Sequence, residues 1–441
     1  MRISPFLRRC LIGLTLLAVL LFAAFIWLRP LLHIGSGYAA KHACSCHFLQ
    51  GRELAEISTH DLNFSVLGFV SLSKQDQEIR SSFFGLVPRK AVFREGVGCT
   101  LINDEQQPLA EVQGAAAGTK NRDERAVVAG PAALAEALDF GMTPVSGGAA
   151  RGLVIMQNGN IIAERYAPGY DQHTRLLGWS MTKTLTAMVL GRALQQTSLA
   201  PAAAPEQLTA RNHLFPEIWT DSARAEITIA DLLHMNSGLA WNEAYGSLSD
   251  ATIMLHEHAD MAEYAYSAPV IASRNTTWNY SSGTTNILTH IADRELPDLT
   301  IQQQYLTLFA DIAPSLLVEP SQLGLPVGSS YGWATTRDWA NLGQFMLQDG
   351  VWNGDTLLAP GWINYLREPA VGSEGGYGGQ TWLPGPDMPS LPKDAFIMRG
   401  FQDQRVFIIP SRNMVIARLG HGVDKATDFD GLISRILGSE E

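Results

Sequence analysis

The longest hydrophobic stretch of the chain lies near its N-terminus. Residues 10–28, CLIGLTLLAVLLFAAFIWL, contain no charged side chain and are just long enough to cross a bilayer as a helix. Arg2, Arg8 and Arg9 precede this run, and by the positive-inside rule they leave the N-terminus in the cytoplasm. We therefore predict a signal anchor over residues 1–30 in the inner membrane, with the rest of the chain in the periplasm. A cleaved signal peptide is the alternative.

Short runs of β-forming residues follow the predicted anchor. They lie at 64–72, 82–87 and 91–93, within a segment that we bound at residues 31–125. The end of this segment, 114–125, is rich in Gly, Ala and charged residues, which is the composition of a loop or linker. We predict an N-terminal extension that lies outside the main domain.

Beyond the linker the pattern becomes first helical and then alternating. A helix is predicted over 130–138, because a Gly-Pro pair opens an apolar run there. Two apolar runs, 152–156 and 161–166, flank the pair Asn158-Gly159, which is a strong signal for a β-hairpin. A second helix is predicted over about 180–195.

Strand patterns lie at both ends of the main domain, and helical patterns lie between them. The stretch 200–205 is rich in Ala and Pro and predicts a loop, and 206–350 is mainly helical in pattern. Two or three strands and a final helix are predicted after it, at 395–398, 405–409, 414–419 and 429–437. We expect one α/β domain over residues 126–441, in which an antiparallel sheet is built from both ends of the chain, is flanked by helices and carries an inserted helical region.

The composition is that of a globular protein with a large core, because 46% of the residues are hydrophobic and 17% are charged. The formal net charge is −11. A nucleic-acid-binding protein needs a basic face for the phosphates, so this charge argues against a nucleic-acid partner.

Three of the four cysteines lie in the part of the chain that we expect to be exported. Cys10 is inside the anchor, whereas Cys44, Cys46 and Cys99 would meet an oxidising compartment. We expect one disulfide from Cys99 to either Cys44 or Cys46. The run His42-Ala43-Cys44-Ser45-Cys46-His47 has four soft ligands that could bind zinc or copper. Its spacing is not that of a zinc finger, so we predict the disulfide and no metal site.

A serine and a lysine stand three residues apart at the start of the second predicted helix. In Ser180-Met181-Thr182-Lys183 the hydroxyl and the amine share one helix face. A serine hydroxyl is a poor nucleophile until a neighbouring base takes its proton, and a lysine whose pKa is lowered by burial can be that base. S-x-x-K is the first signature of the penicillin-recognising serine hydrolases, although the tetrapeptide alone is a weak signal.

A second motif follows about 100 residues later, Trp278-Asn279-Tyr280-Ser281-Ser282-Gly283. An acyl-transfer enzyme must protonate its leaving group, and a tyrosine beside a lysine amine can deliver that proton. Tyr280 is the candidate for this role. Ser282 is a candidate for a hydrogen bond to Lys183 or to the substrate.

Together with these two motifs, three further stretches carry a resemblance to a known family. They are 232–239 (LLHMNSGL), 333–340 (WATTRDWA) and 399–404 (RGFQDQ). In this order and at this spacing, the chain resembles the class C β-lactamase-related serine hydrolases, and it looks most like the branch of 6-aminohexanoate-dimer hydrolases and related esterases. The resemblance covers roughly residues 126–438.

The resemblance implies both a fold and a set of roles. The fold is the β-lactamase-like sandwich. Ser180 would be the acylated nucleophile, Lys183 its base, and Tyr280 the group that serves the leaving group and later the attacking water. An oxyanion hole would lie between the N–H of Ser180 and an N–H near Gly400 or Phe401. This chemistry requires no cofactor.

Two positions depart from the pattern of true β-lactamases. Those enzymes carry Lys-Thr-Gly where this chain has Met398-Arg399-Gly400, and usually Asn where it has Ser282. Arg399 would replace the missing charge, unless strand alternation points it to solvent. Gln404, in the same stretch, is a further candidate for substrate contact. The departures favour an esterase or amidase for a small or uncharged acyl group over a β-lactamase.

Other interpretations use the same residues. The stretch 178–182 is an incomplete G-x-S-x-G elbow, and His421 with an aspartate would complete a Ser-His-Asp triad. His234 is expected to be a buried turn residue rather than a base. A β-lactamase or peptidase for cell-wall-like substrates is another enzyme of this kind, and an exported binding module is the non-enzymatic alternative. Our main prediction is a serine hydrolase whose partners are a small ester or amide substrate and the inner membrane.

Overall fold

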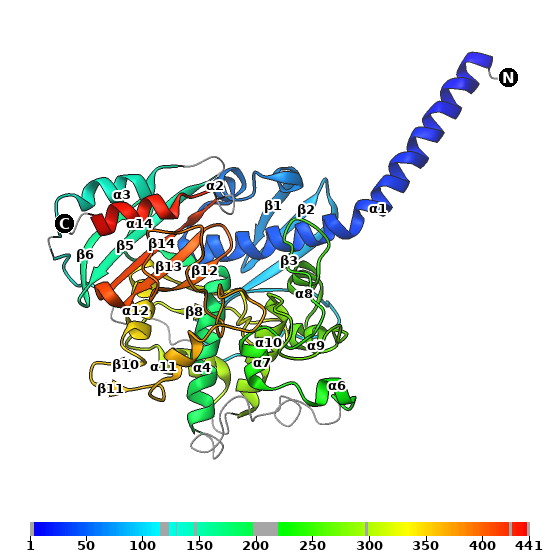
Figure 1. Ribbon diagram of the computed structural model, residues 1–441. Helices are drawn as coiled ribbons and strands as arrows, with labels where there is room; N and C mark the ends of the chain where they lie inside the picture. Colours follow the sequence, from blue (N-terminus) through cyan, green and yellow to red (C-terminus); the bar gives the residue numbers. More distant parts are fainter. Residues whose placement is uncertain are drawn as a thin grey trace.

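The computed structural model shows a layered body from which one long helix projects (Figure 1). It describes residues 4–114, 123–128, 130–144, 148–196, 219–295, 299–422 and 426–438. The predicted loop at 200–205 and most of the predicted linker at 114–125 lie outside these ranges.

The main sheet joins segments that are far apart in the sequence. Its strands, in spatial order, are β12 (Phe396–Gly400), β13 (Gln404–Ile409), β14 (Met414–His421), β5 (Ala149–Gln157) and β6 (Asn160–Tyr166). All neighbouring strands are antiparallel. The β5–β6 hairpin turns at Asn158-Gly159, where both residues have the positive φ that such a tight turn requires. The predicted sheet, built from both ends of the chain, is confirmed.

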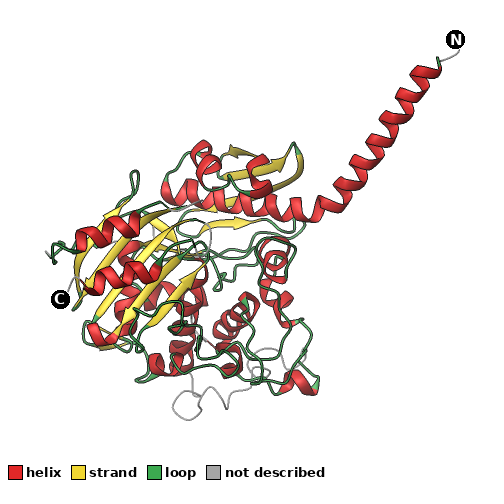
Figure 2. Cartoon of the chain, turned by 45° about the horizontal axis from the view of Figure 1, so that its top comes forward, coloured by secondary structure: helices red, strands yellow, loops and turns green. Residues whose placement is uncertain are grey.

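Helices cover both faces of this sheet (Figure 2). α3 (Leu134–Met142) and α14 (Phe429–Gly438) pack on one face, and α12 (Thr336–Leu347) packs on the other. Successive residues of a strand point to opposite faces, so Leu153 of β5 belongs to the apolar cluster of α3 and α14, whereas Val154 belongs to the larger cluster on the α12 side. The sheet is therefore apolar on both faces and needs a helical layer on each.

The region between the two halves of the sheet is mainly helical, as predicted. Its helices are α4 (Thr182–Gln196), α6 (Ser222–Ala225), α7 (Ile229–Leu233), α8 (Asp250–Glu257), α9 (Met261–Tyr266), α10 (Ser282–Glu295) and α11 (Ile301–Leu308). Thr228, Ser249 and Thr300 open α7, α8 and α11 with capping boxes, which pair the first free N–H groups of each helix. The remaining short elements are β7 (Arg175–Leu177), β8 (Leu317–Val318), β9 (Gly332–Thr335), β10 (Val351–Trp352), β11 (Asp355–Thr356) and α13 (Trp362–Leu366).

The N-terminal segment is built on one unbroken helix. α1 (Pro5–Gln50) continues across residue 30, where we expected the anchor to end. Its most apolar window has a mean hydropathy of 2.7 and no buried residue, so this helix is long and apolar enough to cross a membrane. Its second half packs against a four-stranded antiparallel sheet and a short helix, which are β1 (Val70–Gln75), β2 (Glu78–Phe83), β3 (Leu86–Arg94), β4 (Gly98–Leu101) and α2 (Leu54–His60).

Two of the strands predicted in this segment are displaced. The run 82–87 contains the turn between β2 and β3, and the first part of the run 64–72 forms a 3₁₀ turn, Ser65–Phe69. The β-forming residues of both runs had predicted strands there. Phe69 and Phe84 are instead exposed at the end of the sheet.

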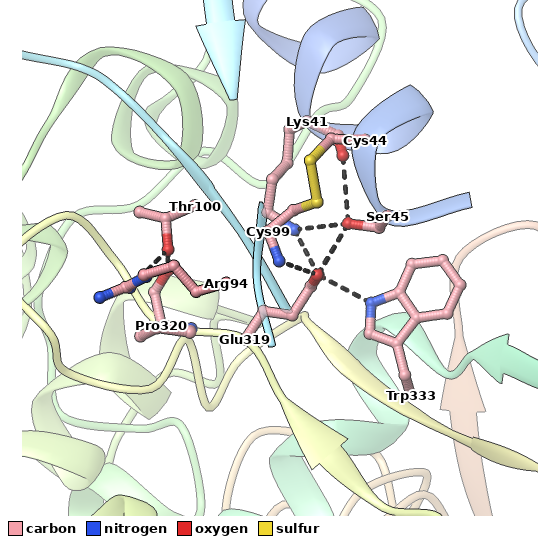
Figure 3. Close-up of a disulfide and its surroundings, with 9 residues drawn as sticks. All are labelled: Lys41, Cys44, Ser45, Arg94, Cys99, Thr100, Glu319, Pro320 and Trp333. Carbon is pink, nitrogen blue, oxygen red and sulfur yellow. Dashed lines mark hydrogen bonds and ion pairs between the residues drawn. A yellow bond between two sulfur atoms is a disulfide. The ribbon is translucent and has the colours of Figure 1, made fainter. Parts of the chain in front are cut away.

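A disulfide fastens the helix to its sheet (Figure 3). It joins Cys44 of α1 to Cys99 of β4, and Cys46 is a buried free thiol. Of the two pairings that we left open for Cys99, the structure therefore has the one with Cys44.

Beside the disulfide, a buried carboxylate joins the segment to the main domain (Figure 3). Glu319 is 0% exposed and forms an ion pair with Lys41 of α1. It also accepts hydrogen bonds from the Ser45 hydroxyl at 2.8 Å and from the Cys99 N–H at 2.7 Å. The indole N–H of Trp333 adds a third at 2.8 Å. One side chain of the main domain thus holds α1, β4 and β9 together.

The expected boundary between extension and main domain is not a boundary in packing. Buried residues of the N-terminal segment, from Ala39 to Leu101, belong to the same apolar cluster as Leu185 of α4 and Trp333 of β9. The segment is therefore one more layer of the same packed unit.

We predict that Glu319→Ala destabilises the protein strongly. Lys41 would remain as a buried cation without its counter-charge, so we expect the free energy of unfolding to fall by about 3–5 kcal/mol. Urea unfolding of the detergent-solubilised full chain measures this change. Glu78→Ala removes the partner of Arg80 in an exposed ion pair and is the control, with an expected loss below about 1 kcal/mol. Equal losses in the two variants would contradict the role given to Glu319.

Candidate active site

The serine of the S-x-x-K motif lies on a tight turn ahead of a helix. Trp179–Met181 form a 3₁₀ turn, and α4 begins at Thr182. The Thr182 hydroxyl donates to the backbone oxygen of Trp179 at 2.7 Å and accepts from the N–H of Gly332 at 2.9 Å. These bonds tie the turn to β9 and fix the position of Ser180.

One helical turn further on, Lys183 brings its amine to this serine. Its Nζ lies 3.2 Å from Ser180 Oγ, 2.8 Å from Ser282 Oγ and 2.9 Å from the backbone oxygen of Ser329. Lys183 is 1% exposed, and this burial lowers its pKa to about 8, although the Glu243 carboxylate acts in the opposite direction. A neutral amine can donate its two protons to Ser282 and Ser329 and keep its lone pair for the Ser180 hydroxyl.

Glu243, in the loop before α8, is a charged group that the sequence analysis missed. Its carboxylate accepts the Ser282 N–H at 2.8 Å and the Tyr245 hydroxyl at 2.8 Å. The Ser282 hydroxyl and the Trp241 indole N–H are further donors to it. Ser282 accepts from Lys183 and donates to Glu243, and so links the lysine to this negative charge.

Tyr280 completes the group around Lys183. The Lys183 Nζ lies 5.1 Å from the centre of the Tyr280 ring. Burial raises the pKa of Tyr280 well above its usual value, and the Glu243 carboxylate adds to this effect. Hydrogen bonding with Ser180 and the charge of Arg399 act against it. Tyr280 is therefore a neutral phenol that can donate its proton at neutral pH.

The edge strand β12 runs directly against the turn that carries the serine. A Cβ atom on Gly400 would lie 2.0 Å from the backbone oxygen of Gly178, so only glycine permits this approach. Phe401, the next residue, packs edge-to-face on Trp179 with ring centres 5.7 Å apart. The backbone of Gly400 and Phe401 thus borders the space in front of Ser180.

Several of these groups line a cleft of about 790 Å³. Its walls include Ser180, Glu243, Tyr280, Trp382, Arg399, Gly400 and Phe401. This volume is in the range of ligand-binding pockets and has room for a small organic substrate.

Arg399 points into the cleft and not away from it. Its guanidinium lies over the Trp382 ring, 4.4 Å from the ring centre, and the residue lines the cleft. Among the described residues it has no ion-pair partner. Arg399 therefore has the orientation that places its positive charge in the cleft, and not the alternative that points it to solvent.

Two other candidates bond to the backbone. The Gln404 amide donates to the backbone oxygens of Phe401, Gln402 and Gly420 at 3.2, 2.9 and 2.8 Å, and Gln404 is 1% exposed. We predicted a substrate contact for Gln404, but its amide holds the turn after β12. His234 caps α7, with Nδ1 3.1 Å from a backbone oxygen of that helix, which fits the turn role expected for it.

His421 belongs to a different cluster. It lies with His42 and Asp61, and one ligand atom of each is within 4.8 Å of the others. Asp61 is 0% exposed and already pairs with Arg52 and Arg151, so a metal cation would be repelled by two guanidinium groups. His421 lines a small cavity with His42 and not the cleft of the serine, so these residues do not assemble the alternative Ser-His-Asp triad.

Comparison with known proteins supplies the family. The Beta-lactamase family matches residues 142–438, which is more than half of the chain. The chain belongs to the β-lactamase family. The resemblance inferred from the motifs and the predicted β-lactamase-like fold are both confirmed.

Several hydrolases share this family's fold with the chain. The 6-aminohexanoate-dimer hydrolase of Paenarthrobacter ureafaciens is 23% identical over 310 residues, 64% of this chain and 76% of that protein. A structure from Bacillus anthracis named after the same enzyme superposes with a TM-score of 0.56 at 18% identity, over 77% of this chain and 88% of that one. A family VIII carboxylesterase superposes with a TM-score of 0.53 at 13% identity, over 71% and 99%. At these identities the structures show a common fold alone.

We predict that Glu243→Gln shifts the pH dependence of fluorophosphonate labelling at Ser180 to lower pH. The carboxylate raises the pKa of Lys183, so its loss should bring that pKa below about 8 and make the amine neutral at lower pH. The rate of Ser180 labelling by a fluorophosphonate, followed across neutral and alkaline pH, measures this. Asp387→Asn removes another carboxylate of the cleft and is the matched control, with no expected shift. A shift to higher pH in Glu243→Gln would contradict the prediction.

Proposed function

We propose that the protein is a serine hydrolase that cleaves an ester or amide bond through an acyl-enzyme on Ser180. The observation that carries this proposal is the Lys183 amine, which is buried, has a pKa of about 8 and lies 3.2 Å from Ser180 Oγ. A lysine in water is charged at neutral pH and has no lone pair to accept a proton. Burial leaves a fraction of the Lys183 amines neutral. The short distance to Ser180 Oγ lets a neutral amine accept the proton of that hydroxyl.

In the acylation step, the neutral Lys183 takes the proton of the Ser180 hydroxyl as Oγ attacks the substrate carbonyl carbon. The tetrahedral intermediate then collapses, and the bond to the alcohol or amine is broken. Tyr280, a neutral phenol beside Ser180, passes a proton to this leaving group and regains one from the Lys183 ammonium. Deacylation reverses these transfers with water as the nucleophile.

The negative oxygen of the intermediate needs donors that are already in place. The N–H of Ser180 and an N–H of Gly400 or Phe401 are the proposed pair. The close contact of Gly400 with Gly178 supports this assignment, because it holds the edge strand beside the serine turn without an intervening side chain. Such a donor typically contributes about 3–4 kcal/mol to transition-state stabilisation.

Arg399 changes the substrate class that the sequence favoured. A small or uncharged acyl group was expected, but the guanidinium points into the cleft and has no acidic partner among the described residues. We infer that the substrate carries a carboxylate in its acyl part or in its leaving group, held by Arg399.

The proposed location is the inner membrane, with the catalytic domain in the periplasm. The exposed apolar part of α1 supports the anchor, and the Cys44–Cys99 disulfide fits an oxidising compartment.

We predict that a fluorophosphonate labels the wild-type protein and that Ser180→Ala abolishes the labelling. Lys183→Met should slow it by about 10²–10⁴-fold, because the base is lost. Ser281→Ala removes a neighbouring serine whose hydroxyl caps α10 and should leave labelling intact. Mass spectrometry of the labelled full chain in detergent measures all four proteins. A folded wild type that stays unlabelled, or label that persists in Ser180→Ala, would favour the binding-module alternative.

We predict that Arg399→Gln discriminates between charged and neutral substrates. The KM for a nitrophenyl half-ester of succinate should rise about 10–100-fold, the value of one hydrogen bond to a charged group. Hydrolysis of nitrophenyl butyrate, which lacks the carboxylate, should change little and serves as the internal control. Equal losses of activity on both esters would contradict a role for Arg399 in recognising the substrate carboxylate.

A further inference from the structure

Exposed apolar side chains gather at one end of the N-terminal sheet. Phe69, Phe84 and Leu86 are 65%, 80% and 49% exposed, and the rings of Phe69 and Phe84 are 6.1 Å apart. β1 begins where β2 ends, since Val70 pairs with Phe83, so the residues before and after this pair meet at the same end. We name Phe69, Phe84 and Leu86 the apolar tip.

The fold does not account for Phe84. Phe83 pairs with Leu86, which leaves Phe84 and Gly85 as a two-residue hairpin turn, and both have positive φ. Turns of this kind select Asn-Gly or Asp-Gly, and a bulky residue at positive φ is strained. The turn therefore carries a phenylalanine that neither eases its backbone nor packs in the core.

The tip lies at the end of the sheet that is nearer the apolar half of α1. A Cβ on Gly35 of α1 would be 3.3 Å from the Phe83 ring, whereas Phe48, further along α1, stacks on Phe93 with ring centres 4.5 Å apart. β3 thus runs alongside α1 in the same direction, and it starts close to residue 35. Figure 1 shows β1 and β2 beside the point at which α1 leaves the body.

The helix sets the height of the tip above the bilayer core. Gly35 is seven residues beyond the end of the apolar run at Leu28, which is about 10 Å along a helix that rises about 1.5 Å per residue. The headgroup region of one leaflet is about 5–8 Å thick outside a hydrocarbon core of about 30 Å. Side chains that extend from the sheet end toward Leu28 therefore reach the membrane interface.

The acidic residues of the sheet lie away from the apolar tip. These residues, Asp76, Glu78 and Glu95, lie in or next to the turns at the opposite end. The stretches 62–75 and 79–94, which contain the tip, have no acidic residue. The end of the sheet that carries the tip would thus present apolar side chains to a lipid surface and no carboxylate of the sheet.

We propose that the apolar tip inserts into the outer interface of the same bilayer that α1 crosses, so that the protein holds the membrane at two points. This proposal goes beyond the hydrolase function and rests on the proposed anchor. Two contacts fix the tilt of the catalytic domain, which a single helix would leave free to swing.

Fluorescence quenching in vesicles tests the proposal on the full chain. In a Cys10→Ser background, Phe84→Cys is labelled with a nitrobenzoxadiazole dye and reconstituted into phosphatidylcholine vesicles with lipids spin-labelled near the headgroup. Gln77→Cys, an exposed position at the opposite end of the same strands, is the matched control. Phe84 is 80% exposed, so its replacement removes little packing, and the free Cys46 is buried.

We expect the dye at position 84 to lose most of its fluorescence and the dye at position 77 to lose little. Quenching at neither position, or equally at both, would overturn the proposal. A dye at 84 that is shielded but unquenched, and that responds to the amount of protein per vesicle, would mean that a second copy covers the tip, which also overturns it.

The anchor and the active site have their own readouts. A separate sample that keeps Cys10 and carries the dye there reports insertion of α1 through quenching by spin-labelled lipids. Fluorophosphonate labelling of each reconstituted variant reports Ser180. The three readouts therefore distinguish the absence of tip insertion from the absence of α1 insertion and from an unreactive Ser180.

Discussion

The candidate active site depends on the burial of one amine. Removing an ammonium ion from water costs several kcal/mol, and this cost lowers the pKa of Lys183. Full compensation by a nearby carboxylate would leave the lysine permanently charged, and no compensation would leave it too weak a base for the proposed transfer of the serine proton. Glu243 acts through the intervening hydroxyl of Ser282, and so it compensates in part. The position of α10 against α4 sets this balance, because Ser282 begins one helix and Lys183 lies on the other.

The local parts of this arrangement were readable in the sequence. The spacing of Ser180 and Lys183 is set within four residues, by the turn Trp179–Met181 and the start of α4, and the turn at Asn158-Gly159 is a property of two residues. The antiparallel sheet also followed from strand patterns at both ends of the chain. Glu243 was not predictable, because its contact with Ser282 spans 39 residues and depends on how a loop packs over a helix. The backbone contacts of Gln404 were not predictable either, since a sequence does not reveal that its amide donates to three carbonyl groups.

The N-terminal segment shows the same limit on a larger scale. Its strands and cysteines suggested a separate extension, and nothing local indicates that Lys41 meets a carboxylate 278 residues away. The segment instead shares a core with the main domain and is joined to it by Glu319. The runs at 64–72 and 82–87 were misplaced for a related reason: a strand pattern assumes that apolar side chains face inward, and at the end of this sheet Phe69 and Phe84 face outward.

The unbroken course of α1 has a consequence for how such an enzyme would meet its substrates. Many anchored enzymes hang from a flexible stalk and sample a deep volume above the bilayer. Here the helix that carries the apolar run also forms part of the folded core, with no loop between the two among residues 5–50. Once α1 crosses a membrane and the proposed contact at the apolar tip holds the tilt, the cleft would move laterally within a thin layer of constant height. The protein would then search for its substrates in two dimensions. It would act only on bonds that lie at that height above the bilayer.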